Sequence, residues 1–133
     1  SISTTVKRVT AGIIHNDSGE ILILRRGPQE SLSGFWEFAG GKVENGESEQ
    51  ACLKRELKEE LGIEVSVGEF IEESHYIYEH GEFMLRAYGA IIMGGKIELS
   101  VHDDSAWVDP EKLQDYKLAP ADIPIAKKLA LKQ

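Results

Sequence analysis

Three glutamates close together in the chain have the residue type and the spacing needed for metal chemistry. Glu56, Glu59 and Glu60 stand at positions i, i+3 and i+4. On an α-helix of 3.6 residues per turn they would fan across roughly 100° of one face. Like charges at this spacing repel and destabilise a helix by about a few tenths of a kcal/mol per pair. A hard divalent cation with oxygen ligands would remove the repulsion, and Mg²⁺ is the usual choice beside phosphates.

A solvated acidic helix face is the other interpretation of these glutamates, because Lys54, Arg55 and Lys58 are interspersed among them. The residues upstream favour the metal. Gly40-Gly41 allows the backbone to come close to a bound group and expose its carbonyls and amides. Glu47 lies in the loop that follows. A glycine turn, an acidic loop and an acidic helix face would form a compact cradle for a metal and a phosphate.

The surrounding pattern predicts a helix that carries these glutamates. Ser48 is suited to cap it, and it should run to about Leu61. Leu53 and Leu57 lie on the same side as Leu61 and form its buried stripe, and Gly62 is a natural stop. The acidic face would therefore be presented opposite or beside a packed leucine face.

Strands and one further helix are expected around that helix. The expected strands cover residues 6–14, 21–24, 63–67, 70–78, 83–93 and 106–108, and a closing helix runs from Pro120 to about 131. The first two strands flank a turn-rich segment, so they look like a hairpin. The order of strands, helix, strands and helix predicts an α/β (α+β) fold with a mixed β-sheet sandwiched between helices. Residues 1–133 have the length of one domain.

Composition limits the classes of partner. The chain has 15 basic and 23 acidic side chains, a formal net charge of −8, which argues against nucleic acid. A small phosphorylated ligand remains compatible if a metal supplies positive charge. Cys52 is the only cysteine, which fits a reducing, cytoplasmic location. No apolar run approaches the roughly 18 residues needed to span a bilayer, so no membrane partner is expected. Composition leaves open whether the protein is a monomer or a homodimer.

One segment resembles a known family. Gly41, five residues, Glu47, seven residues and then Arg55-Glu56-Leu57-Lys58-Glu59-Glu60-Leu61-Gly62-Ile63 is similar to a complete Nudix box. Residues 34–44 and 118–124 resemble the MutT and CTP pyrophosphohydrolase branches of the Nudix hydrolases. The resemblance implies the Nudix fold and Mg²⁺-dependent hydrolysis, with Mn²⁺ as a substitute. The substrate would be a nucleoside triphosphate, normal or oxidised, cleaved to the monophosphate and pyrophosphate.

Two other functions are weighed against this one. The first is hydrolysis of another diphosphate-linked nucleotide, such as a nucleotide sugar or a dinucleoside polyphosphate. The second is a non-catalytic Nudix module that binds a nucleotide as a sensor. Such a module is expected to have lost box carboxylates, and all of them are present here.

The resemblance also implies roles for the box residues. The metal would be held by the carbonyl before the box and by the box glutamates, here Gly40, Glu56, Glu59 and Glu60. A box glutamate usually serves as general base, and Glu56 and Glu59 are the two candidates. Arg55 and Glu47 resemble a pair that braces the loop against the helix, with direct phosphate contact as the alternative.

Substrate contacts are expected from four further residues. Arg26, Glu37 and Phe38 match substrate-pocket positions of the family, although Arg26 could be a cation at a strand end and Phe38 a core residue. Asp122 matches a position that holds Asn in MutT-like 8-oxo-dGTP hydrolases, and Asp resembles the CTP pyrophosphohydrolase branch. An ionised carboxylate only accepts hydrogen bonds, so Asp122 favours cytosine-type or mixed oxidised bases. The alternative is that Asp122 caps the last helix.

The roles of a few other polar and aromatic residues are also considered. Some relatives have a further catalytic carboxylate before the last strand, and Asp103 and Asp104 lie near that position. Ala106 stands beside Trp107, so whether either aspartate supplies this group is open.

Core positions are expected for Cys52, Trp36 and Trp107. Solvated positions are expected for Arg25 and for four histidines that share no metal-ligand spacing, His15, His75, His80 and His102.

Overall fold

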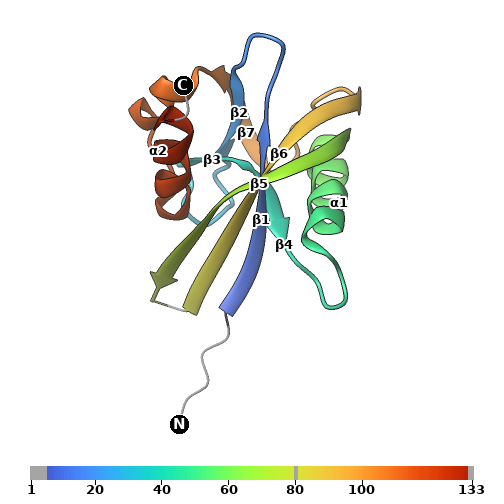
Figure 1. Ribbon diagram of the computed structural model, residues 1–133. Coiled ribbons are helices and arrows are strands. Elements are labelled where there is room, and N and C mark those ends of the chain that lie inside the picture. Colours follow the sequence, from blue (N-terminus) through green and yellow to red (C-terminus); the bar gives the residue numbers. More distant parts are fainter. Residues whose placement is uncertain (1–5, 80, 132–133) are drawn as a thin grey trace.

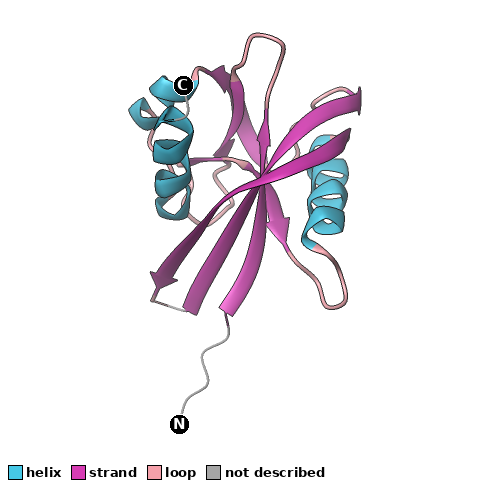
Figure 2. Cartoon of the chain, viewed as in Figure 1, coloured by secondary structure: helices cyan, strands magenta, loops and turns pink. Residues whose placement is uncertain are grey.

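Two β-sheets lie between two α-helices in a computed structural model of the chain, which describes residues 6–79 and 81–131. Helix α1 (Glu49–Leu61) covers one side of the sheets and α2 (Ile123–Leu131) covers the other (Figures 1 and 2). This arrangement confirms the expected α/β architecture in which helices sandwich β-structure. Neither described helix is long and apolar enough to cross a membrane.

The first sheet is mixed and the second is antiparallel. The four strands of the first run in the order β4-β1-β6-β5, with bounds Ala39–Lys42, Val6–Ile14, Gly81–Gly95 and Ile63–Tyr78. Strand β1 is parallel to β6 and antiparallel to β4. The second sheet has the order β3-β2-β7, with bounds Trp36–Glu37, Ile21–Arg26 and His102–Val108. Two 3-10 helices, η1 (Pro110–Asp115) and η2 (Pro120–Asp122), precede α2, and the sequence had not indicated η1.

The hairpin expected between the first two strands is wrong, because β1 and β2 belong to different sheets. Strand β2 is buried on both faces. Ile21 and Ile23 contribute to the core beneath α2, whereas Leu22 and Leu24 contribute to the core beneath α1. Neighbouring strands in sequence usually pair, but a strand enclosed on both faces is placed by the packing of the two cores. The segments expected at 63–67 and 70–78 form one bulged strand, β5.

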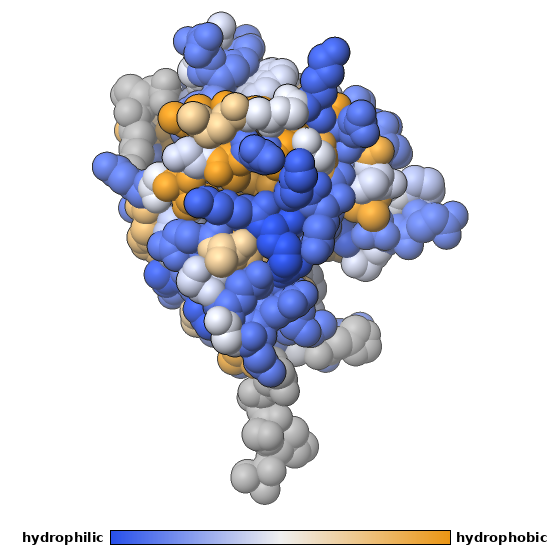
Figure 3. All heavy atoms as spheres, turned by 90° about the vertical axis from the view of Figure 1, so that its right-hand side faces the viewer, coloured by the Kyte–Doolittle hydropathy of each residue, from blue (hydrophilic) through white to orange (hydrophobic). Residues whose placement is uncertain are grey.

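Helix α1 forms as its local signals predict. The Ser48 hydroxyl accepts a hydrogen bond from the Ala51 amide at 3.1 Å, and Gly62 ends the helix in the left-handed region with φ 71°. Four side chains on its inner face are buried, namely Cys52, Leu53, Leu57 and Leu61. Seen from the side of α1, the surface is largely hydrophilic, with a hydrophobic strip above it (Figure 3).

Glu49 fastens the first turn of α1 to the first sheet. Its side chain is 10% exposed and accepts hydrogen bonds from Arg8 on β1 and from Arg86 and Tyr88 on β6. Burial raises the pKa of Glu49, but the hydrogen bonds from Tyr88, Arg86 and Arg8 outweigh it and hold the pKa below its ordinary value. Glu49 therefore acts as an ionised anchor that sets where the acidic helix begins.

Replacing this anchor should destabilise the fold. We expect Glu49→Ala to lower the free energy of unfolding by about 2–3 kcal/mol, because three donors lose a buried, charged acceptor. Urea denaturation at pH 7 measures the change. Glu73→Ala is the matched control, since Glu73 also pairs with Arg86 but is 40% exposed and should contribute less than about 1 kcal/mol. Equal losses in the two variants would show that Glu49 is an ordinary surface partner.

Candidate active site

Two glycines on β4 allow close packing, one of them against the acidic helix and the other against β1. Strand β4 pairs with β1, with Gly41 opposite Thr10 and Gly40 opposite Ala11. A Cβ at Gly41 would overlap the carboxyl group of Glu56, and one at Gly40 would overlap the Thr10 carbonyl. Only glycine fits this close approach. Gly41 and the acidic helix are therefore in contact, and the two glycines lie in a strand and not in the turn that the sequence had indicated.

Arg55 joins the loop to the helix. Its Nε and Nη2 donate to the two carboxylate oxygens of Glu47 at 2.7 and 3.0 Å, and Nη2 also donates to the Lys42 carbonyl at 3.1 Å. Its Nη1 donates to Glu56 at 2.8 Å and to Glu59 at 3.2 Å. The hydrogen bond from Arg55 lowers the pKa of Glu47 to about 2, helped by the Glu44 backbone. Arg55 thus orders the loop and two helix carboxylates at once.

The three helix carboxylates differ in their surroundings. Glu59 is 61% exposed in its side chain, whereas Glu56 is 14% exposed beneath Arg55. Burial raises the pKa of Glu60 to about 7, and the charge of Glu56 adds to the shift. A cation beside Glu60 would relieve both effects.

These donors suit a hard divalent cation, although they do not yet converge. All are oxygens, from a backbone carbonyl at Gly40 and carboxylates on adjacent helix turns, the ligands that such ions prefer. Within residues 6–79 and 81–131, no three His, Cys, Asp or Glu side chains lie close enough to form a metal site as they stand. Hydrogen bonds from Arg55 hold the carboxylates of Glu56 and Glu59 to one side. For these carboxylates to bind an ion, their side chains must rotate and loosen those hydrogen bonds.

A cavity of about 590 Å³ opens beside the acidic helix. Predicted residues that line it are Arg26, Glu37, Phe38, Gly40, Gly41, Glu60 and Asp122. Predicted residues that lie outside its lining are Glu47, Arg55, Glu56, Glu59 and Gly62. The structure therefore brings the substrate-type residues to one cavity, which Glu60 and the two glycines of β4 also line.

Arg26 and Arg25 point in different directions, as strand alternation predicts. Arg26 donates to Glu37 at 2.9 Å and lines the cavity. Arg25 donates to Asp103 at 2.7 Å and lies 4.0 Å from Asp104. Neither aspartate lines the cavity, so their positions do not support a further catalytic carboxylate at Asp103 or Asp104.

The expectation of a solvated loop is wrong for His102. Strand β7 begins at His102, earlier than expected, and the side chain is only 3% exposed. Its Nε2 lies 2.8 Å from a Glu37 oxygen, and the residue lines the cavity. A β-bulge, seen as a register shift between Arg25 and Arg26, places His102 opposite Arg26, so simple alternation along the strand could not have revealed its position. His75 lies on β5 and contacts Glu82, and His80 is outside the described residues.

Phe38 and Asp122 are both buried in the wall of the cavity. Phe38 is 4% exposed and lies where the chain crosses from β3 to β4, so it belongs to the core and to the cavity. Asp122 is 6% exposed at the end of η2. Burial raises the pKa of Asp122 well above its ordinary value, and the charge of Glu37 adds to this. A hydrogen bond from the Phe38 backbone and the charge of Arg26 oppose the shift.

Two aromatic residues, Tyr78 and Phe83, form another part of the cavity wall. The sequence had not indicated this role for them. The rings of Tyr78 and Phe83 pack edge to face with centroids 4.9 Å apart, and both residues line the cavity. Burial raises the pKa of Tyr78, and the charge of Asp122 contributes next. The phenol is therefore close to the group expected to select the base.

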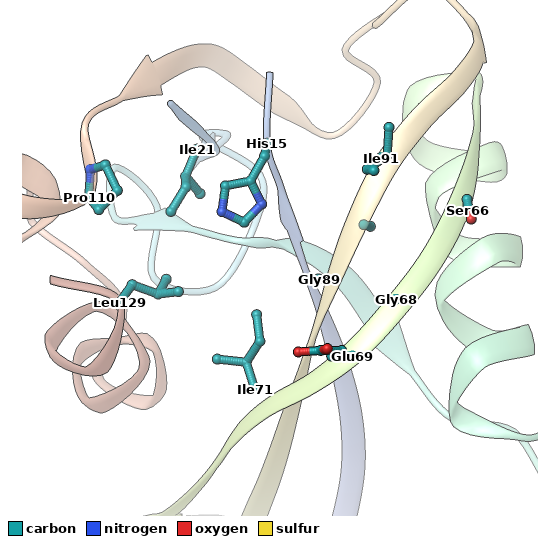
Figure 4. A pocket seen from close by; sticks show the side chains of 11 residues that line it. His15, Ile21, Ser66, Gly68, Glu69, Ile71, Gly89, Ile91, Pro110 and Leu129 are labelled. Atoms are coloured by element: carbon teal, nitrogen blue, oxygen red, sulfur yellow. The ribbon is translucent and has the colours of Figure 1, made fainter. Parts of the chain in front are cut away.

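A second hollow, of about 360 Å³, lies between β5, β6 and α2 (Figure 4). Its side chains are mostly apolar, including Ile21, Ile71, Ile91, Pro110 and Leu129, with His15, Ser66 and Glu69 as the polar ones. It brings together no carboxylate cluster and no arginine. The chemistry of metal and phosphate therefore belongs to the larger cavity.

Comparisons with known proteins agree with this geometry. The chain is 45% identical over 118 residues to the CTP pyrophosphohydrolase of Escherichia coli (strain K12), covering 88% of this chain and 86% of the relative. It is 40% identical over 105 residues to the putative 8-oxo-dGTP diphosphatase 2 of Mycobacterium tuberculosis (strain ATCC 25618 / H37Rv), covering 77% and 73%. The solution structure of the E. coli ORF135 protein matches with a TM-score of 0.84 and 39% identity, covering 97% and 92%.

The family follows from a further match that spans most of the chain. The model of the NUDIX domain matches residues 6–129, which include both sheets, α1 and nearly all of α2. The two glycines of β4, the acidic helix and the residues lining the adjoining cavity all fall within that match. The chain therefore belongs to the Nudix family, whose members generally use divalent metals.

Proposed function

We propose that this protein hydrolyses a nucleoside triphosphate of the CTP/dCTP or 8-oxo-dGTP type to the monophosphate and pyrophosphate. One observation carries the proposal. Glu60 of the acidic helix and the polar side chains suited to a base, Glu37 and Asp122, line a single cavity. The similarity to a CTP pyrophosphohydrolase and to a putative 8-oxo-dGTP diphosphatase supports the same substrate class. The partner is then a free nucleotide.

The metal would be Mg²⁺, with Mn²⁺ as a substitute, held by the Gly40 carbonyl, Glu56, Glu59 and Glu60. When bound, such an ion polarises a diphosphate and lowers the pKa of an attacking water. Arg55 orients Glu56 and Glu59 through its hydrogen bonds, and either carboxylate could then accept a proton from an attacking water. Arg55 and Glu47 would act as a brace, and Gly41 and Gly62 would set the approach and the end of the helix.

The nucleoside would be held by Arg26, Glu37, Phe38 and Asp122. Phe38 offers an apolar surface in the cavity wall, and Glu37 offers carboxylate oxygens that accept N–H or O–H donors. Asp122 is deeply placed and has an unusual pKa, as expected of a group that reads a base in a water-poor site.

Product identification tests the function. We expect CTP, dCTP or 8-oxo-dGTP with Mg²⁺ to yield the monophosphate and pyrophosphate, separated by anion-exchange chromatography. Adding inorganic pyrophosphatase should then release two phosphates for each nucleotide cleaved. Hydrolysis restricted to nucleotide sugars or dinucleoside polyphosphates would overturn the substrate class. Nucleotide binding without any turnover would instead identify a sensor module.

Asp122→Asn tests the choice of base. We expect the ratio of kcat/KM for CTP to that for 8-oxo-dGTP to change by about tenfold, equivalent to about 1.4 kcal/mol. Asn caps a helix about as well as Asp, so stability should barely change. Because the pKa of Asp122 is raised, its carboxyl gains acceptor character as pH rises. The preference for CTP should therefore strengthen with pH in the wild type and stay flat in the variant. An unchanged ratio would leave Asp122 as a cap.

A further inference from the structure

Both carboxylate oxygens of Glu37 are held by donors from neighbouring strands. Arg26 Nη1 donates to Oε1 at 2.9 Å, and His102 Nε2 lies 2.8 Å from Oε2. The three residues come from β2, β3 and β7, the three strands of the second sheet, and Arg26 is paired with His102 just beyond a β-bulge. Their side chains are 21%, 20% and 3% exposed for Arg26, Glu37 and His102. The cluster lies in the wall of the substrate cavity.

The hydrogen bond between His102 and Glu37 has a defined direction. Glu37 accepts a hydrogen bond from Arg26, and a carboxylate accepts hydrogen bonds only. Nε2 of His102 is therefore the donor. The other ring nitrogen, Nδ1, is buried and has no hydrogen-bond partner among the described residues. Burying a polar atom without a hydrogen-bond partner is unfavourable. An apolar side chain at this position would avoid that cost, so stability alone does not explain a histidine.

We propose that His102 is a positioning residue that, with Arg26, fixes the Glu37 carboxylate for recognition of the nucleoside. This inference rests on the proposed function. An ionised carboxylate has about four lone-pair sites, of which the two donors occupy two. The remaining sites are held in one orientation and can accept N–H or O–H donors of a bound nucleoside. Prior ordering of this kind lowers the entropy cost of binding.

The charges around Glu37 show why its carboxylate needs a second hydrogen-bond donor in addition to Arg26. The charge of Glu37 raises the pKa of Asp122, and Arg26 opposes that shift. Two carboxyl groups in one cavity wall repel when both are ionised, and each can reduce the repulsion by turning away. A donor on each oxygen of Glu37 prevents this rotation. Loss of His102 should therefore weaken nucleotide binding.

Two substitutions at His102 separate positioning from packing. His102→Leu removes the donor, whereas His102→Gln keeps an N–H at a reach similar to that of Nε2. With CTP and saturating Mg²⁺, we expect His102→Leu to raise KM about tenfold and to leave kcat within about threefold. His102→Gln should bring KM back to within about threefold of the wild type. The matched control is His75→Leu, which removes a half-exposed histidine that also contacts a glutamate and should leave KM unchanged.

Two further measurements report on the hydrogen bond between His102 and Glu37 and do not depend on enzyme activity. Nitrogen NMR of the imidazole should show His102 protonated at Nε2 and unprotonated at Nδ1 in the neutral ring. The affinity for CMP should fall about tenfold in His102→Leu and recover in His102→Gln. In a Glu37→Gln background, His102→Leu should add little further loss, because the two residues act as one unit.

The outcomes distinguish this inference from the proposed function. An inactive wild type that still binds CMP would remove the proposed function, and the CMP affinities would then decide the role of His102. An active wild type with unchanged KM in His102→Leu would overturn the inference alone. Parallel loss of kcat, KM and stability in both the Leu and Gln variants would also overturn it, since that pattern indicates packing.

Discussion

Glu60→Gln is expected to lower kcat by at least about 100-fold, equivalent to about 2.7 kcal/mol of transition-state stabilisation. The substitution is nearly isosteric, but it removes the charge of a proposed metal ligand at the edge of the cavity. Steady-state kinetics with CTP at saturating Mg²⁺ measures the loss. Glu64→Gln is the control, since it removes the same charge from a side chain that is 71% exposed and outside the cavity. Turnover near that of the wild type would exclude Glu60 as a ligand.

The same variant should be more stable than the wild type in the absence of metal. The pKa of Glu60 in the folded protein is about 7, above the ordinary 4.5, because burial and Glu56 disfavour its charge. Its contribution to stability is complete below about pH 4.5 and is lost as pH rises through 7. The Tm of Glu60→Gln should therefore exceed that of the wild type at pH 8, and the two should converge near pH 4.5. Added Mg²⁺ should raise the wild-type Tm and reduce the difference.

Removal of divalent metal is expected to abolish activity. Excess EDTA should reduce turnover to below about 1% of the Mg²⁺ value, since the ion supplies several kcal/mol of stabilisation in such chemistry. Mg²⁺ or Mn²⁺ added beyond the chelator should restore it. Ca²⁺ offers a useful comparison, because its larger and looser coordination shell should bind the same carboxylates with poorer geometry. Full activity in EDTA would contradict the assignment of the acidic helix as a metal site.

The pH dependence follows from the same carboxylates. Activity should rise from pH 6 towards alkaline pH, because Glu60 must lose its proton near pH 7 to bind a cation. Raising the Mg²⁺ concentration should move the rise to lower pH, since the ion competes with the proton. Profiles of kcat/KM at two Mg²⁺ concentrations measure this shift. A profile that does not move would place the controlling proton elsewhere.

Local signals were sufficient for the acidic helix. Ser48 and Gly62 lie at its two ends in the conformations that their residue types favour. The leucine spacing fixes the buried face, so the carboxylates at i, i+3 and i+4 lie on the neighbouring face, where Glu59 is exposed and Glu56 and Glu60 are part-buried. Each of these effects acts within one or two helix turns. The helix and its acidic face could therefore be predicted from sequence.

Contacts between distant segments decided the rest of the site. Glu37 and His102 are separated by 65 positions and meet because β3 and β7 flank β2 in one sheet. Glu49 and Arg8 are separated by 41 positions and meet because α1 packs on the first sheet. Strands β1 and β2, in contrast, are neighbours in the sequence but belong to different sheets. Such pairings depend on which hydrophobic faces close over each other, and local sequence carries little information about that choice.

The sequence by itself determined the family, the acidic helix, the glycine approach and the identity of the groups suited to a metal and a diphosphate. These features depend on residue types at fixed local spacing, which backbone geometry converts directly into structure. Only the tertiary structure decided that Arg26, Glu37, His102 and Asp122 share one cavity wall, and that burial raises the pKa of Asp122. Burial and long-range pairing arise when both cores form together, so they become defined only in the folded chain.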